Sequence, residues 1–228
     1  QLFPVLMDVL TSAPREFGVK LNVTVKRGAD GQNQLTLELL GQLVGTTTEL
    51  ADLLAPAYAL VAPVLEEISS LDYWDAQARL SVEPSSGFSY ERSHCADDPI
   101  SEQGMATILQ QLRAWPGLDG SGDWKVFLCG GRVADVAPDA TAYVHRQVFG
   151  VSSVELEWAG DVPLDELQVN LDWVDDFHEA MQAFTSNRSY QNFIDASQTD
   201  FLTAYYGENL ARLVQVKAKY DPDNVFNY

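Results

Sequence analysis

The sequence predicts an α+β fold in which an antiparallel β-sheet is covered on one face by α-helices. The clearest sign is a hairpin, because residues 18–27 and 34–45 both alternate apolar with polar side chains and the turn-forming stretch Gly28–Gly31 joins them. The second sign is the order of the later elements, in which strand-like runs alternate with segments of helical spacing, the longest beginning at Pro163. One face of such a sheet would remain free for a ligand or for another domain.

Each helix and strand is expected from a local signal. A capping box formed by Thr46 and Glu49 begins one helix, and Ser101 is the N-cap of another. Strands are expected where apolar, β-branched or aromatic residues form short runs. The predicted helices cover residues 2–12, 46–59, 72–76, 101–115, the stretch after Pro163, 199–206 and 208–220. The further predicted strands cover residues 64–71, 88–95, 124–129 and 148–158, and residues 83–87 are expected to form a loop.

The charge of the chain limits its classes of function. It has 33 acidic and 14 basic residues, which give a formal net charge of -19 and an isoelectric point near 4.2. Nucleic acids and anionic membrane surfaces are both recognised by basic surfaces, so we expect neither as a partner. No apolar run approaches the length of a membrane span. The sequence also lacks a nucleophile elbow, a P-loop and the ligand spacing of a zinc site.

Redox state and location are less constrained. Cys95 and Cys129 are the two cysteines, so a disulfide between them and a pair of free thiols are both open interpretations. Sequons at Asn22 and Asn187 would fit a secreted protein, but such triplets also arise by chance, so a cytoplasmic location stays open. The chain begins at Gln1 without the layout of a signal peptide, and this abrupt start suggests a piece of a longer protein.

The C-terminal tail carries an ordered series of short motifs. They are Tyr190–Phe193 with Asp195, Tyr205–Asn209, Arg212–Leu213, Val216–Lys217 and Tyr220–Phe226. In this order they resemble the C-terminal signature of the berberine-bridge-enzyme-like FAD-linked oxidases, a branch of the vanillyl-alcohol oxidase superfamily. The plainer interpretation of the same residues is an amphipathic helix pair that ends at a proline. The resemblance extends to the middle of the chain through Ser70–Ala76, Phe88–Ser93, Pro99–Ser101, Gly130–Arg132 and Thr141–Arg146.

The resemblance implies one part of a two-domain enzyme. Residues 1–186 would form a substrate-binding domain, and residues 187–228 a tail that returns to a flavin domain absent from this chain. The implied cofactor is FAD, and the implied partners are an FAD-binding domain or chain and a small-molecule substrate. The implied reaction oxidises an alcohol or hemiacetal carbon of a sugar or secondary metabolite by hydride transfer to the flavin, with oxygen as the acceptor. This chain alone would be inactive.

The resemblance also assigns site residues. Tyr190, in the Tyr-x-Asn motif, would be the base that removes the hydroxyl proton, and because a free tyrosine has a pKa of about 10 it would need neighbouring donors. Asn192 would lie on the same side of an extended strand and bind the flavin edge or the substrate, unless it only forms a turn. Relatives carry Gln or Glu on the strand after His145, where this chain has Ser153, so Ser153 is a substrate-binding candidate and Glu155 a substitute acid or base.

Four further residues are weaker candidates. Asn224 and Tyr228 lie where the family's tail folds back toward the flavin domain, so both would contact FAD, although Asn224 fits a turn cap slightly better. Arg92 and Trp74, the latter beside Tyr73, would line the substrate pocket.

Two rival functions remain. The same fold could work without flavin as a non-catalytic binding module, with the free sheet face holding a partner. A hydrolase would use Glu155 with Asp135 or Asp139, but no spacing supports such a carboxylate pair. The His145–Arg146 pair is expected to be structural, at the edge of the sheet.

Overall fold

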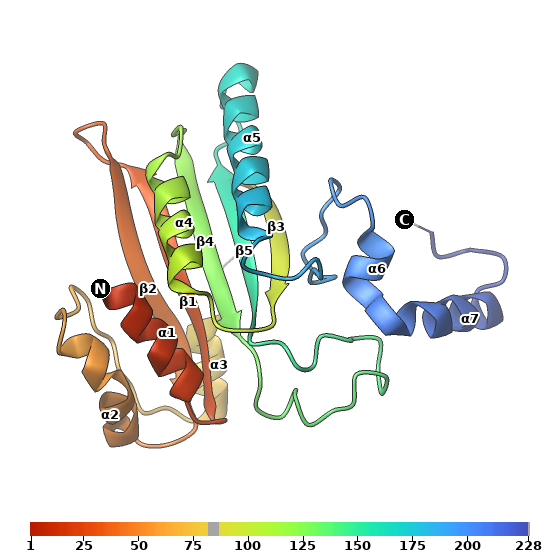
Figure 1. Ribbon diagram of the computed structural model, residues 1–228, viewed down its shortest axis with the longest axis horizontal. Helices are drawn as coiled ribbons and strands as arrows, with labels where there is room; N and C mark the ends of the chain where they lie inside the picture. Colours follow the sequence, from red (N-terminus) through yellow and green to blue (C-terminus); the bar gives the residue numbers. More distant parts are fainter. Residues whose placement is uncertain (82–86, 228) are drawn as a thin grey trace.

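The computed structural model describes residues 1–81 and 87–227. A five-stranded sheet forms its centre, with strand order β2-β1-β4-β5-β3 and antiparallel pairing between all neighbours (Figure 1). The α+β fold predicted from the sequence is therefore confirmed. The strands are β1 (Phe17–Arg27), β2 (Asn33–Leu43), β3 (Phe88–Ala96), β4 (Gly120–Leu128) and β5 (Gly150–Trp158).

Three helices form a layer on the sheet and three elements form a tail, while α2 packs against α1 and α3 contacts β2. Helices α1, α4 and α5 lie against one face of the sheet, whereas α6, η1 and α7 extend beyond the β3 edge (Figure 1). None of the described helices is both long enough and apolar enough to span a bilayer. The helices are α1 (Leu2–Ser12), α2 (Thr47–Tyr58), α3 (Tyr73–Leu80), α4 (Glu102–Arg113), α5 (Leu164–Met181), α6 (Phe201–Tyr206), the 3₁₀ turn η1 (Gly207–Asn209) and α7 (Leu210–Tyr220).

The predicted helix caps are present. Glu49 N donates to Thr46 Oγ1 at 3.2 Å, and Thr46 N donates to Glu49 Oε2 at 2.7 Å, which completes the capping box at the start of α2. At the start of α4, Gly104 N donates to Ser101 Oγ at 3.1 Å. These side chains satisfy backbone N–H groups that have no partner inside the helix.

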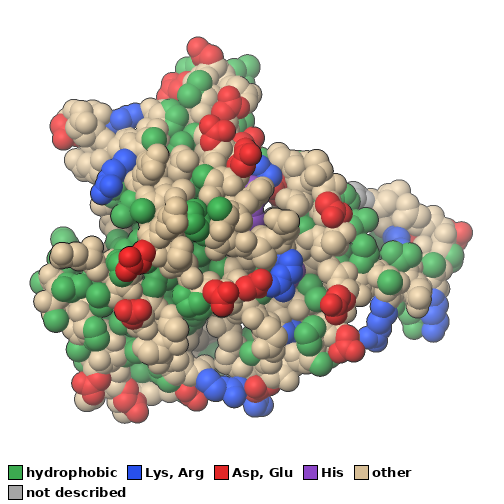
Figure 2. Space-filling model, in the orientation of Figure 1, with side chains coloured by type: hydrophobic (Ala, Val, Ile, Leu, Met, Phe, Trp, Pro, Cys, Tyr) green, Lys and Arg blue, Asp and Glu red, His purple; other side chains and the backbone are tan. Residues whose placement is uncertain are grey.

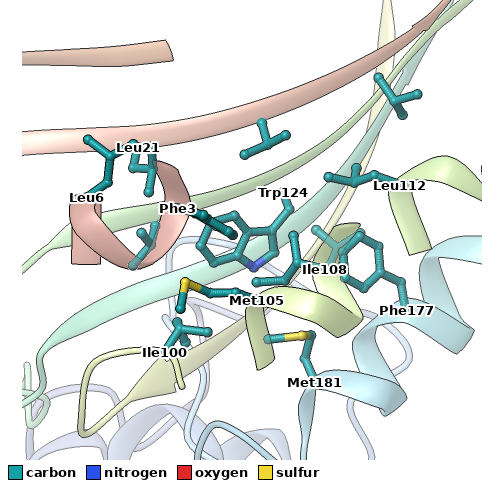
Figure 3. Close-up of a cluster of buried hydrophobic side chains, with 14 of the residues drawn as sticks. Phe3, Leu6, Leu21, Ile100, Met105, Ile108, Leu112, Trp124, Phe177 and Met181 are labelled. Atoms are coloured by element: carbon teal, nitrogen blue, oxygen red, sulfur yellow. The ribbon is translucent and has the colours of Figure 1, made fainter. Parts of the chain in front are cut away.

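Alternation along β1 explains which face of the sheet is covered. The apolar residues from Val19 to Val25 are buried against the helices, while the polar residues between them point away. Trp124 of β4 lies at the centre of this core (Figure 3). Its ring is fully buried and meets Phe3 of α1 edge to face at 5.6 Å, and its Nε1 donates to Ser152 Oγ at 3.0 Å.

Two predicted elements differ from the structure. The strand predicted at residues 64–71 is wrong, because this segment pairs with no strand and leaves apolar side chains such as Val64 and Leu65 in solvent. Helix α7 forms as predicted, but its apolar face is not buried, since Val214 and Val216 are 59% and 44% exposed. Of the loop expected at residues 83–87, all but the last residue lie outside the described part of the chain.

Both cysteines are free thiols, so of the two interpretations of the sequence the structure contains the pair of free thiols and not the disulfide. Burial raises the pKa of Cys95 to about 12 and also raises the pKa of Cys129. Both side chains are therefore protonated and unreactive at neutral pH.

The three histidines of the chain are all buried. His94 of β3 stacks on His178 of α5 with ring centroids 3.8 Å apart, and His145 Nε2 lies 3.1 Å from the backbone oxygen of Tyr205. Burial lowers the pKa of each ring, to about 3 for His94 and about 4 for His178. All three imidazoles are therefore neutral in the folded protein at neutral pH.

We expect the free energy of unfolding to fall as the pH drops from about 6.5 toward 5. A histidine in the unfolded chain has a pKa of about 6.5, whereas the folded protein holds all three below that value, so the unfolded state binds more protons in this window. Each histidine that takes up a full proton changes stability by about 1.4 kcal/mol per pH unit. Urea denaturation at several pH values would measure the slope, which His94→Phe should reduce. A flat profile would contradict the expectation.

Replacing Trp124 should destabilise the fold strongly. Trp124→Ala would leave a cavity at the centre of the core, and we expect the free energy of unfolding to fall by about 3–5 kcal/mol. Trp74→Ala is the matched control, because Trp74 is 78% exposed and its loss should cost less than about 0.5 kcal/mol. Chemical denaturation of both variants tests the comparison, and similar losses for the two would disprove it.

Candidate active site

A row of polar side chains crosses the uncovered face of the sheet. The strand register places Ser93 of β3, Ser153 of β5, Lys125 of β4 and Asn22 of β1 side by side in that order. Each of them alternates along its strand with residues that face the helix layer, so all four side chains point to the opposite side. Ser153, predicted to bind substrate, therefore lies in the middle of this row.

A second, more acidic row lies two residues further along the strands. It consists of Glu91, Glu155, Asp123 and Thr24, which the register aligns on the same four strands. Three carboxylates thus come together from three strands that are far apart in the sequence. Such a grouping needs either cations or hydrogen-bond donors to hold the charges.

Lys125 joins two of these carboxylates. Its Nζ lies 3.0 Å from Glu91 Oε1 and 2.5 Å from Glu155 Oε2, and Ser153 Oγ donates to Glu91 at 2.8 Å. The charged side chains are only 12–15% exposed. Burial raises the pKa of Glu91, against the effect of Lys125. On Lys125 burial acts toward a lower pKa, but the two glutamates outweigh it, so the pKa of Lys125 is raised.

Hydrogen-bond donors hold the third carboxylate. Asp123 accepts from Asn22 Nδ2 at 3.2 Å, from Thr24 Oγ1, and from Ser121 Oγ at 3.2 Å. Asn22 Oδ1 is buried and has no hydrogen-bond partner among the described residues. The uncovered face thus holds one buried acceptor that a donor from elsewhere could satisfy.

The tail crosses the edge of the sheet at the end of the first row. Ser189 Oγ donates to the backbone oxygen of Ser93 at 2.8 Å, and the next backbone N–H, that of Tyr190, donates to Ser93 Oγ at 3.1 Å. One residue earlier, the carbonyl of Arg188 accepts from Cys95 N at 2.6 Å. Two segments nearly a hundred residues apart therefore meet at Ser93, and they bring Tyr190 next to the row that contains Ser153.

Aromatic rings surround Tyr190. Its ring meets Phe193 edge to face at 5.2 Å and Tyr143 at 6.1 Å, and Phe193 in turn contacts Phe127 of β4 at 5.9 Å. Burial raises the pKa of Tyr143, so this neighbouring hydroxyl keeps its proton at neutral pH. Of the two tyrosines, Tyr190 is consequently the better candidate for a base.

Asn192 supplies the donor that the sequence led us to expect beside Tyr190. Its Nδ2 donates to Tyr190 Oη at 2.9 Å, so the two side chains lie on the same side, as predicted. The predicted extended backbone is wrong, however, because Phe193 N donates to the backbone oxygen of Tyr190 at 2.9 Å and closes a turn. A hydrogen bond donated to a phenol oxygen favours the phenolate form, which is the form that acts as a base.

Arg92 lies away from this site. On β3 it alternates with Glu91 and Ser93, so it faces the helix layer. Its Nε is 2.8 Å from Asp195 Oδ2 in the tail and its Nη1 is 3.1 Å from Asp175 Oδ1 in α5. Arg92 therefore fastens the tail to the helix layer, and the structure does not bring it to the uncovered face as the sequence led us to expect.

The remaining predicted residues are also dispersed. Trp74 lies on α3, 78% exposed, with its ring 5.1 Å from that of Tyr73. Asn224 has a φ of 51° and its N–H donates to Asp221 O at 3.1 Å, which is the geometry of the turn cap that the sequence slightly favoured. Tyr228 lies outside the described residues.

The residues of the hydrolase alternative do not assemble. Asp135 lies 2.6 Å from Arg15 Nη2 and 3.4 Å from Arg132 Nη1, whereas Glu155 is bound by Lys125. Within the described ranges, no group of three or more His, Cys, Asp or Glu side chains could hold a metal ion. The structure therefore provides neither a carboxylate pair from these residues nor a metal centre there.

Sequence reasoning missed five residues of the uncovered face. The signal that would have found them is alternation, because polar residues between buried apolar residues of a strand must face the other side of the sheet. Lys125, between the buried residues Trp124 and Val126, is an example. The missed residues are Asn22, Thr24, Glu91, Asp123 and Lys125.

The arrangement of the sheet, the helix layer and the tail matches solved structures. Berberine bridge enzyme from Eschscholzia californica superposes with a TM-score of 0.81 at 20% identity, over 100% of this chain and 50% of that chain. At this identity the likeness shows a shared fold. The fold is thus that of one half of a berberine bridge enzyme.

Sequence comparison points to the same group of proteins. The family model described as "Berberine and berberine like" matches residues 189–228. Two Bacillus subtilis proteins, both described as uncharacterized FAD-linked oxidoreductases, are similar: YgaK at 29% identity over 84% of this chain, and YvdP at 32% over 82%. Each alignment covers 42% of the relative, so the chain spans less than half the length of these proteins. The chain is therefore similar to the C-terminal portion of the berberine-bridge-like FAD-linked oxidoreductases.

Removing the cation of the uncovered face should destabilise the chain in a pH-dependent way. Lys125→Met leaves Glu91 and Glu155 together without a cation, and we expect the free energy of unfolding to fall by about 1–3 kcal/mol at neutral pH. The loss should shrink toward pH 4, because burial raises the pKa of Glu91 and this carboxyl group becomes protonated as the pH falls. Lys26→Met, on the exposed part of the same face, should change stability by less than about 0.5 kcal/mol. The network would be contradicted if the two variants lost the same stability, or if the stability lost in Lys125→Met did not depend on pH.

Proposed function

We propose that this chain forms the substrate-facing part of an FAD-dependent oxidase and that Tyr190 is its catalytic base. The proposed substrate group is an alcohol or hemiacetal carbon of a sugar or secondary metabolite. The observation that carries the proposal is the hydrogen bond from Asn192 to Tyr190 Oη, beside an uncovered sheet face with polar side chains. Similarity to the FAD-linked oxidoreductases supports the flavin chemistry.

The residues present fit the ring end of FAD. Tyr190 and Asn192, with the aromatic rings of Tyr143 and Phe193, form a mixed polar and aromatic surface, and Asn22 Oδ1 is a buried acceptor without a partner in the described chain. A flavin ring offers an apolar face and an edge with both donors and acceptors. We assign the adenosine and pyrophosphate to a separate FAD-binding domain, because pyrophosphate is held by basic groups or helix N-termini and the uncovered face is acidic.

The proposed reaction removes a hydride from the substrate carbon and a proton from its hydroxyl, which leaves a carbonyl. FAD supplies the two-electron acceptor for the hydride when it is bound, and dioxygen is the proposed final acceptor, with hydrogen peroxide as the product. Tyr190 takes the hydroxyl proton at Oη, and Asn192 stabilises the phenolate by donating to the same atom. We assign to Ser153 and Lys125 the orientation of further hydroxyl groups of the substrate, which their neighbouring positions on the uncovered face support.

The proposed partner of the tail is the FAD-binding domain. On α7 the side chains of Val214 and Tyr220 are 59% and 74% exposed, and beyond the helix Val225 and Phe226 are each 73% exposed. A soluble protein rarely leaves such apolar surface uncovered, so a contact with a neighbouring domain is the expected use of this segment. Asn224 then shapes the turn that presents Val225 and Phe226 to that domain.

Tyr190→Phe tests the role of the base in the full-length flavoprotein. We expect turnover with a substrate found by screening sugars and aromatic alcohols for peroxide formation to fall about 100-fold to 10,000-fold. The flavin absorbance and the melting temperature should be unchanged, because the ring packing is kept. Tyr206→Phe is the matched control, since its hydroxyl makes no hydrogen bond among the described residues. Full activity of Tyr190→Phe would refute the assignment.

The alternative is a non-catalytic binding module, in which the uncovered sheet face holds a partner and no flavin takes part. The absorption spectrum of the native full-length protein separates the two functions. A flavin band supports the oxidase. A folded, pure full-length protein that never takes up FAD would support the module instead.

A further inference from the structure

A hollow lies on the other side of the β3 edge from Tyr190. Figure 2 shows histidine atoms inside it, between α5 and the tail. Its volume is about 410 Å³, and its walls come from β3, the end of α5, the segment before Tyr190 and the start of α6. This volume is within the range of small-molecule sites. The site named above as the candidate active site shares none of the side chains that line this hollow.

Two neutral imidazoles form the floor of the hollow. His94 and His178 line it, are 5% and 3% exposed, and stack with an angle of 17° between their rings. A neutral imidazole carries one donor nitrogen and one acceptor nitrogen. The floor is therefore uncharged at neutral pH, but it retains hydrogen-bonding atoms.

One of these atoms lacks a partner. The Nε2 atom of His178 is buried and has no partner among the described residues. A hydroxyl group both donates and accepts hydrogen bonds, so a hydroxyl of an occupant of the hollow would satisfy Nε2 in either tautomer of the neutral ring.

The walls around this nitrogen are polar. Gln198 and Thr203 of the tail face the hollow and can each donate and accept. Arg188 is held in an ion pair by Asp97, and Asp200 is exposed to solvent. Neither residue therefore gives an ion a buried partner of opposite charge, whereas hydroxyl groups can bond to the neutral ring and to the amide and hydroxyl side chains of the walls.

We propose that this hollow binds a neutral polyhydroxylated small molecule of the sugar or polyol class, with one hydroxyl hydrogen-bonded to His178 Nε2. This site goes beyond the proposed oxidase function, because it does not require flavin or the substrate face. Its occupant would connect β3 and α5 to the tail residues that follow Ser189, and Ser189 and Tyr190 both bond to Ser93. Binding would therefore also stabilise the segment that holds Tyr190.

Titration of the full-length protein with glucose and with myo-inositol, followed by imidazole nitrogen NMR and calorimetry, tests the proposal. We expect saturable binding with a Kd of about 1 mM or below and a shift of the His178 Nε2 resonance. Sodium sulfate and putrescine, as anionic and cationic probes, should bind at least about tenfold more weakly. Tighter binding of either ion, or no saturable binding of a polyol, would overturn the proposal.

Variants locate the binding. Gln198→Leu and Thr203→Val remove donors from the wall without disturbing the buried stack, and each should weaken polyol binding several-fold. His178→Phe keeps a ring in the stack and should abolish binding. If this variant fails to fold, polyol binding by the two wall variants still tests whether the ligand occupies the hollow. Lys26→Met, at an exposed position outside the hollow, should bind polyol as well as the unchanged protein does. Loss of binding in Lys125→Met together with unchanged binding in both wall variants would place the ligand on the uncovered sheet face and refute this site.

Discussion

Burial of one sheet face against α1, α4 and α5 is the constraint on which the rest of the molecule depends. Because side chains alternate along a strand, placing Trp124 in the core forces Asp123 and Lys125 onto the opposite face. The same alternation on β3 sends Glu91 and Ser93 to the uncovered face and Arg92 to the helix layer. Packing the core therefore also determines which polar groups are available for chemistry and which act as fasteners of the tail.

Ser93 is the point at which the tail, the uncovered face and the histidine pair are joined. Its side chain accepts from Tyr190 N, its carbonyl accepts from Ser189 Oγ, and the next residue, His94, stacks on His178. One residue of an edge strand thus supports the candidate base on one side of the sheet and the polar hollow on the other. An edge strand can do this because half of its backbone groups are free to pair outside the sheet.

The sequence was informative wherever a signal is local. The hairpin, the caps at Thr46 and Ser101 and the amphipathic α5 all follow from neighbouring residues, and the structure contains them. Segment 64–71 was misread, because an apolar run becomes a strand only when another strand pairs with it. The Glu91–Lys125–Glu155 network was invisible for the same reason: its members lie on three strands whose order and register no local pattern reveals. Tyr190 was found through its motif, whereas its hydrogen bond with Asn192 depends on a turn.

The strand order also governs how the chain is completed during synthesis. The hairpin of β1 and β2 emerges from the ribosome before β4, but the second edge of β1 pairs with β4, from Lys20 opposite Phe127 to Val25 opposite Gly122. Until β4 has been made, that edge of β1 has no strand to pair with. Translation of the intervening segment is therefore the interval in which the nascent chain is most exposed to mispairing and most dependent on chaperones.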